Sequence, residues 1–118
     1  MPSCRTNLAL AISFLCLTVP IWAHAILLKA TPSVNQIVSG PTTSIEFQFN
    51  SRVDGKRSKL TLIGPDGHPR ALAISEQSSP NSISSQATEL TPGSYTVRWQ
   101  VLAQDGHITR GEVPFKVR

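Results

Sequence analysis

Beyond residue 23 the chain contains neither cysteine nor methionine, because Met1, Cys4 and Cys16 all lie before that point. This part therefore has no thiol for nucleophilic catalysis, no disulfide and no sulfur donor of the kind that a Cu(I) site uses. A glycine-rich phosphate loop and a closely spaced carboxylate pair are also missing. The net charge of +4 is not gathered into a basic run, so it does not indicate a nucleic-acid-binding protein. With 118 residues, one domain is expected.

The first residues have the pattern of a secretory signal. One basic residue, Arg5, is followed by an uncharged apolar stretch at 8–19 that is too short to cross a bilayer as a helix. We therefore expect a signal peptide at 1–23, export to the periplasm, and a mature domain at 24–118. A membrane anchor, or a lipoprotein formed at Cys16, fits the pattern less well.

Two cleavage points compete at the end of this segment. A cut after Ala25 satisfies the small-x-small pattern better, because Ala23 and Ala25 would then occupy both specificity positions. A cut after Ala23 instead makes His24 the first residue of the mature chain. The local pattern slightly favours the cut after Ala25.

The rest of the chain alternates apolar and polar residues with period two, which is typical of β-strands. The clearest runs are 43–50, 59–63, the segment around Leu72 and Ile74, 95–101 and 113–117. Turn sequences separate them, and the Ser-rich stretch 75–88 is expected to be a loose connection with one short strand near Ile83. The pattern predicts an all-β, antiparallel Greek-key sandwich of about seven strands, immunoglobulin-like in size, in which Tyr95 could bond to the upstream backbone.

His24, Asp105 and His107 are the residues that could carry chemistry. In an extended segment Asp105 and His107 would share a face, and Gly106 between them permits unusual backbone geometry. A histidine at the chain terminus offers both its α-amine and its ring Nδ1, so the three residues supply three nitrogens and one oxygen. Such a tetragonal set suits Cu(II) better than Zn²⁺.

Plainer interpretations remain open for the same residues. Asp105-Gly106-His107 could be an ordinary hairpin turn with an exposed histidine, and His24 could be a remnant of the signal. His68, in the sequence PDGHP, is expected to be a solvated turn residue. Asp54-Gly55 is expected to be a turn, and the basic cluster Lys56, Arg57 and Lys59 that follows it a solvated turn and not an interface.

These residues coincide with a family resemblance. Over nearly all of 24–118 the sequence resembles the CopC family of periplasmic copper-resistance proteins. The points of resemblance are 24–32 (HAILLKATP), 47–50 (FQFN), 90–99 (LTPGSYTVRW) and Asp105-Gly106-His107 followed by Gly111, Phe115 and Val117.

The resemblance implies a cupredoxin-like or immunoglobulin-like sandwich that binds Cu(II), with His24, Asp105 and His107 as ligands. It also implies cleavage before His24, where members of the family begin their mature chains, and a CopD-like inner-membrane copper transport protein as a candidate partner. The chain departs from the family in two ways that matter here. Some members carry a methionine-rich Cu(I) segment where this chain has residues 64–70, and some carry an acidic residue at the position of Ser51.

Three functions therefore compete. The leading hypothesis is a monomeric periplasmic protein that is not an enzyme and that sequesters or carries one Cu(II). The second is a small copper oxidase resembling lytic polysaccharide monooxygenases, which also use a terminal histidine and a second histidine. The third is a metal-free structural sandwich.

Overall fold

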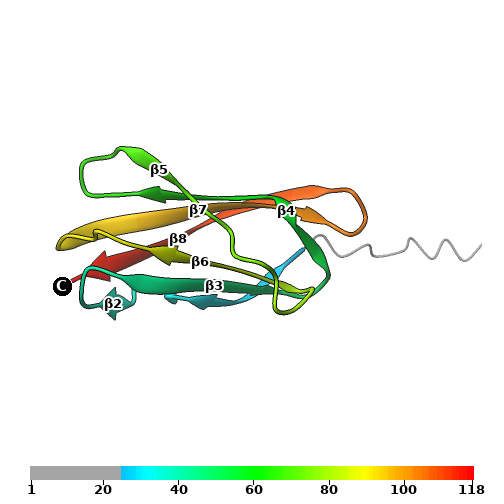
Figure 1. The fold of residues 1–118 in the computed structure, drawn as a ribbon, viewed down its shortest axis with the longest axis horizontal. Helices are drawn as coiled ribbons and strands as arrows, with labels where there is room; N and C mark the ends of the chain where they lie inside the picture. The colour runs from blue at the N-terminus through cyan, green and yellow to red at the C-terminus, as the bar shows by residue number, and fades with distance from the viewer. Residues whose placement is uncertain (1–24) are drawn as a thin grey trace, which may run out of the picture.

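The computed structural model describes residues 25–118, which form eight β-strands (Figure 1). The expected signal peptide and His24 lie outside the described residues. Nothing in residues 25–118 forms a helix of the length and apolarity that a membrane crossing needs. The strands are β1 (Leu27–Thr31), β2 (Ile37–Val38), β3 (Thr43–Phe49), β4 (Val53–Ile63), β5 (Pro69–Leu72), β6 (Ser82–Ala87), β7 (Gly93–Ala103) and β8 (Ile108–Val117).

The strands build two sheets that face each other, as the edge-on view in Figure 1 shows. One sheet has the order β1-β3-β6 and the other the order β2-β8-β7-β4-β5. Consecutive strands such as β3 and β4 lie in different sheets, as in Greek-key sandwiches. The predicted β-sandwich is confirmed, with one strand more than the expected count. β2 pairs with β8 in parallel and is two residues long, too short to leave an alternating pattern in the sequence.

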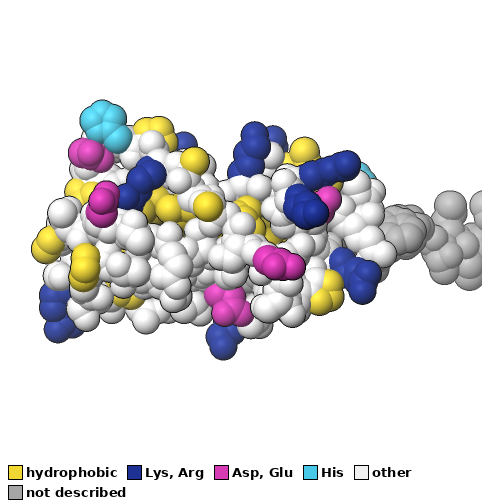
Figure 2. Space-filling model, viewed as in Figure 1, with side chains coloured by type: hydrophobic (Ala, Val, Ile, Leu, Met, Phe, Trp, Pro, Cys, Tyr) yellow, Lys and Arg dark blue, Asp and Glu magenta, His cyan; other side chains and the backbone are white. Residues whose placement is uncertain are grey.

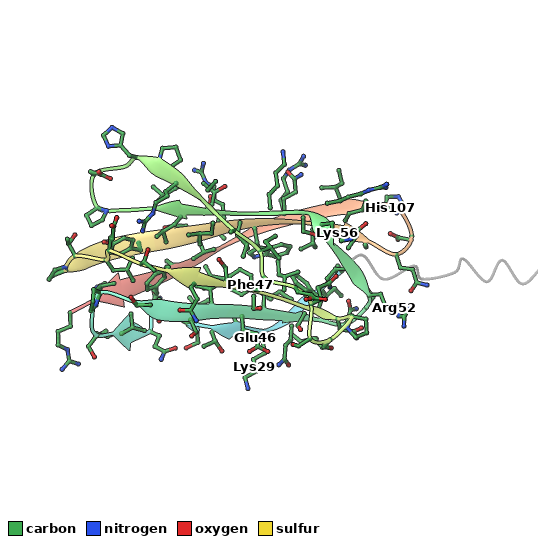
Figure 3. All side chains as sticks on the ribbon, viewed as in Figure 1. Lys29, Glu46, Phe47, Arg52, Lys56 and His107 are labelled. Atoms are coloured by element: carbon green, nitrogen blue, oxygen red, sulfur yellow. The ribbon has the colours of Figure 1, made fainter. Side chains whose placement is uncertain are left out.

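The core lies between the sheets and is made by the alternating faces of the strands. On β7, Tyr95, Val97 and Trp99 point inward and are buried, whereas Arg98 between them is exposed. Figure 3 shows Phe47 of β3 inside the sandwich, with Glu46 and Lys29 on the outside of the same sheet. The ring of Phe49 meets Trp99 edge to face at 5.2 Å between centroids, which ties the two sheets together.

Trp99 requires a glycine on the neighbouring strand. Its register partner on β8 is Gly111, and a Cβ atom there would lie 2.3 Å from the indole ring. The glycine is therefore a steric necessity, because the indole occupies the space of the missing side chain.

Tyr95 closes the connection that leads into β7. Its hydroxyl accepts a hydrogen bond from the Thr91 N–H at 2.9 Å and donates one to the Thr91 carbonyl at 3.0 Å. The ring stacks on Phe115 with 5.5 Å between centroids. The expected bond from this tyrosine to the upstream backbone is confirmed.

Two local expectations were wrong. Asp54-Gly55 was expected to be a turn, but it lies inside β4 at a shift in the pairing with β7. The Asp54 carboxylate accepts hydrogen bonds from the Lys56 and Arg57 N–H groups, which satisfies the backbone locally while the strand continues. Ile74 was expected to be in a strand, but β5 ends at Leu72.

Candidate metal site

Asp105, Gly106 and His107 form the tight connection between β7 and β8. The Ala103 N–H donates to the His107 carbonyl at 2.8 Å, and the Gly106 N–H donates to the Ala103 carbonyl at 2.9 Å. Gly106 has φ of 85°, a left-handed conformation that glycine adopts readily. The segment is thus a turn and not the extended segment that we expected. The hairpin alternative describes its backbone correctly.

The turn nevertheless brings the two candidate ligands together. The His107 N–H donates to Asp105 Oδ1 at 2.9 Å, and His107 Nδ1 lies 3.0 Å from Asp105 Oδ2. The two side chains differ in exposure: 61% for His107 and only 10% for Asp105. A nearly buried carboxylate beside an accessible imidazole is an arrangement that could hold a cation at the surface.

The start of the described chain is fastened at the same end of the sandwich (Figure 1). Ala25 is 1% exposed and belongs to the core cluster. Asn50 binds Ile26 at two points: its Oδ1 accepts from the Ile26 N–H at 2.8 Å, and its own N–H donates to the Ile26 carbonyl at 3.0 Å. Ala25 and Ile26, the first residues that the structure describes, are therefore held in a defined place at this end of the sandwich.

The same bend between β3 and β4 also contacts the turn. The Gln104 N–H donates to the Arg52 carbonyl at 3.1 Å. Figure 3 shows Arg52 and His107 labelled at this end of the molecule. Residues 50–52 thus connect the start of the described chain to the Asp105–His107 turn. Only Asn50 of these residues belongs to the sequence motif FQFN, and the motif did not indicate this role.

Asp105 and His107 are two of the three predicted site residues, and the structure brings them into contact. Within residues 25–118, no group of three or more His, Cys, Asp or Glu side chains is placed to hold a metal ion. The third predicted ligand, His24, lies outside the described residues and stays a prediction. A third His, Cys, Asp or Glu ligand for the Asp105–His107 pair would therefore come from outside residues 25–118.

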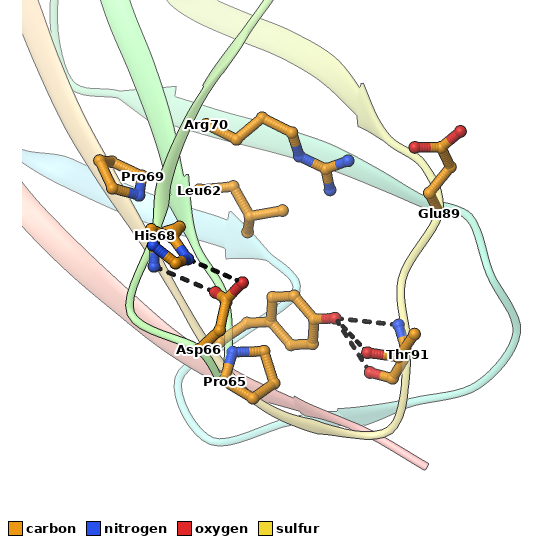
Figure 4. A pocket seen from close by; sticks show the side chains of 10 residues that line it. Leu62, Pro65, Asp66, His68, Pro69, Arg70, Glu89 and Thr91 are labelled. Atoms are coloured by element: carbon orange, nitrogen blue, oxygen red, sulfur yellow. Dashed lines mark hydrogen bonds and ion pairs between the residues drawn. The ribbon is translucent and has the colours of Figure 1, made fainter.

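His68 lies in a second turn at the opposite end of the sandwich. Its Nδ1 is 3.0 Å from Asp66 Oδ2, and both side chains line an open pocket of about 340 Å³ (Figure 4). The guanidinium of Arg70 lines the same pocket and donates to the Thr88 carbonyl. At 84% exposure His68 is the solvated turn residue that we expected.

Known proteins resemble this chain in both sequence and fold. A family model described as the CopC domain matches residues 27–118. The chain belongs to the CopC family. Protein YobA of Escherichia coli K12 is 35% identical over 114 residues, covering 93% of this chain and 92% of that protein.

Two further relatives agree with this assignment. Copper resistance protein C of Pseudomonas syringae pv. tomato is 30% identical over 104 residues, covering 81% of this chain and 82% of the relative. The crystal structure of CopC from Methylosinus trichosporium OB3b superposes with a TM-score of 0.72 and 29% identity, covering 80% of this chain and 93% of that one. The likeness therefore covers the whole sandwich.

Proposed function

We propose that this protein is exported and binds one Cu(II) with the α-amine and imidazole of His24, the carboxylate of Asp105 and the imidazole of His107. The observation that carries the proposal is the 3.0 Å approach of His107 Nδ1 to Asp105 Oδ2, beside the fastened start of the chain. Membership of a family with copper-resistance proteins supports copper as the cargo.

The spacing of the pair fits adjacent ligands of one metal ion. Metal–nitrogen bonds of about 2.0–2.1 Å at right angles place neighbouring donors about 3 Å apart. A nitrogen-rich set completed by one carboxylate oxygen favours Cu(II), which also stands at the top of the divalent affinity order. Residues 25–118 contain no cysteine or methionine, so they offer Cu(I) no thiolate or thioether.

The proposed role of His24 uses its place in the sequence, two residues before Ile26. Two extended residues span roughly 7 Å, so the proposal requires His24 to lie within about that distance of Ile26, which Asn50 holds at the same end of the sandwich as the turn (Figure 1). Signal cleavage after Ala23 would place a free amine on that histidine. This amine has an ordinary pKa near 7.7–8.0, which lets a tightly bound metal displace its proton at neutral pH.

The proposed role is sequestration or carriage, without turnover. Asp105 would occupy a ligand position that an oxygen-activating copper site keeps open, which disfavours the oxidase alternative. The periplasm is the proposed location, and a CopD-like inner-membrane protein is the proposed recipient of the metal. We expect the protein to act as a monomer.

The test begins with the intact mass of the protein purified after export, which should correspond to a chain starting at His24. That protein should bind one Cu(II) with a tetragonal electron paramagnetic resonance signal and nitrogen couplings. One alanine inserted before His24 should weaken binding by more than about a hundredfold, because even outer-shell changes at metal sites cost 10–100-fold.

The matched control carries one extra alanine after Arg118 and should bind like the wild type. Undiminished affinity in the chain extended before His24, or a mature chain that begins at Ile26, would overturn the proposed ligand set. Reductant-dependent peroxide release by the copper-loaded protein would favour the oxidase instead.

A further inference from the structure

The net positive charge of residues 25–118 is confined to one face. Ten basic and seven acidic residues lie in this range, because Arg5 precedes it. Six of the basic residues and two of the acidic ones belong to β4, β7 and β8: Lys56, Arg57, Lys59, Arg98, Arg110 and Lys116, with Asp54 and Glu112. We call this set the basic face. The remaining four basic and five acidic residues sum to −1, so the basic face, at +4, accounts for the whole positive excess.

Strand register places these side chains next to one another. Lys59, Gln100 and Arg110 are direct partners across β4, β7 and β8, and Thr61, Arg98 and Glu112 form the next row. All six lie on the outer side of the five-stranded sheet, opposite the buried residues of the same strands. Figure 2 shows dark-blue side chains gathered toward the end of the molecule where the described chain begins.

The charged groups of the basic face are accessible and partly held in place. Arg98 pairs with Glu112 at 2.8 Å, and Arg110 Nε donates to the Gln100 side chain at 2.9 Å. Lys59, Arg98 and Arg110 line a shallow hollow of about 340 Å³. This hollow could receive an anionic group the size of a phosphate.

Two aliphatic side chains continue the face toward the Asp105–His107 turn. Leu102 and Ile108 are register partners at the ends of β7 and β8, and they point to the same outer side as Gln100 and Arg110. Ile108 is 51% exposed although it is a large aliphatic residue. The outer face therefore combines cations with an apolar pair, of which Ile108 is exposed and Leu102 half-buried, directly beside the candidate metal site.

We propose that the basic face docks on the surface of an anionic phospholipid bilayer. Phosphate headgroups lying above apolar chains match cations that lie beside an aliphatic pair on the same face, and each basic residue close to such a surface adds to the attraction. An acidic protein would satisfy the cations but would leave the Leu102–Ile108 pair without a partner. Docking in this way would bring the Asp105–His107 turn to the membrane surface, where a membrane-bound metal acceptor would lie.

The experiment measures binding of the metal-free protein to vesicles, so its result does not depend on the proposed copper site. Wild-type protein should sediment with vesicles of equal parts phosphatidylglycerol and phosphatidylcholine at low salt, and not with phosphatidylcholine alone. The double variant Lys59→Glu/Arg110→Glu should bind at least about tenfold more weakly, because four units of charge change on the docking face.

The matched control, Lys29→Glu/Arg118→Glu, changes the net charge equally at exposed positions outside the basic face. Its affinity for the anionic vesicles should fall by less than about twofold. Thermal melting followed by circular dichroism should show that all variants are folded. Ile108→Ser should weaken the binding that remains at higher salt.

Equal losses in the two double variants would overturn the proposal, because net charge alone would then explain binding. Binding to phosphatidylcholine alone, or no binding to any vesicle, would also overturn it. Wild-type binding to polyglutamate but not to anionic vesicles would assign the face to an acidic protein.

Discussion

The chain contains the tripeptide Asp-Gly-His twice, and the two copies have nearly the same local structure. In the 66–68 turn the histidine N–H donates to the aspartate at 3.0 Å, the ring lies 3.0 Å away, and glycine has φ of 78°. In the 105–107 turn these values are 2.9 Å, 3.0 Å and 85°. Their surroundings differ: the aspartate side chain is 68% exposed in the first turn and 10% exposed in the second.

Local sequence thus sets the conformation of the turn, whereas the tertiary contacts decide what the turn can do. The 66–68 turn projects from the β4–β5 connection into solvent, with Arg70 lining the same pocket. The 105–107 turn is linked through Arg52 to the bend that also fastens Ile26. The proposed metal site therefore needs the second environment, and the tripeptide alone does not specify it.

Removing the side chains of each turn gives the largest expected contrast. Asp105→Ala/His107→Ala should lower Cu(II) affinity by more than about a hundredfold, since two donors are lost where even outer-shell changes cost 10–100-fold. Asp66→Ala/His68→Ala, the matched control, should leave affinity within about twofold, because that pair lies in the exposed turn at the other end of the sandwich. The measurement is competitive titration with a chromophoric Cu(II) chelator, and equal losses in both variants would contradict the asymmetry.

Asn50 makes two hydrogen bonds to Ile26, and these hold the start of the described chain near the 105–107 turn but not near the 66–68 turn. Breaking one of them tests whether this difference between the two turns matters for metal binding. Asn50→Ala removes the acceptor for the Ile26 N–H and should weaken Cu(II) binding by about tenfold, the lower end of what outer-shell changes cost. Gln48→Ala is the matched control, because this exposed amide on β3 bonds only to the Glu46 side chain among the described contacts. Unchanged affinity in Asn50→Ala would mean that the start of the chain is held by other contacts.

Alanine substitutions at Gly67 and Gly106, the central residues of the two turns, distinguish the effect of backbone strain from the effect on metal binding. A Cβ at Gly67 or Gly106 would meet no atom within 4 Å, so alanine costs only the left-handed conformation, about 1–2 kcal/mol of unfolding free energy at either position. Urea unfolding of the metal-free variants should therefore give similar losses. Cu(II) affinity should fall only in Gly106→Ala, and a fall in both variants would indicate a global effect.

The fold could be predicted from the sequence because its signals are local and repeated. Alternation along 43–50 and 95–101 marks inward faces, and the motif LTPGSY marks the connection that Tyr95 closes. The turn predicted at Asp54-Gly55 was wrong, because an aspartate side chain can accept hydrogen bonds from the following N–H groups in a β-bulge as well as in a turn. β2 was missed because its pairing with β8 depends on tertiary contacts and not on its own two residues.

The site could be predicted only in part. The candidates Asp105 and His107 were found from spacing, but the physical reason was wrong, since a turn and not an extended strand joins them. Asn50 and Arg52 contribute through backbone and amide contacts that no pattern of ligating residues reveals. The identical tripeptide at 66–68 shows that the sequence motif could not decide which turn has the surroundings of a site.

The smallest expected effect concerns the exposed turn alone. The His68 N–H, and then the His68 side chain, hold the pKa of Asp66 below its usual value. A carboxylate with a lowered pKa stabilises the folded state above its unfolded-state pKa, and this contribution disappears as pH falls through the folded-state value.

Carbon-detected NMR titration should show the lowered pKa of Asp66, and His68→Ala should reverse only part of the shift because the backbone N–H remains. Gln86→Ala, which removes an exposed side chain bonded to Ser44 on another strand pair, should leave the titration unchanged. A full return to the usual pKa in His68→Ala would show that the imidazole, and not the backbone geometry shared by both turns, controls this carboxylate.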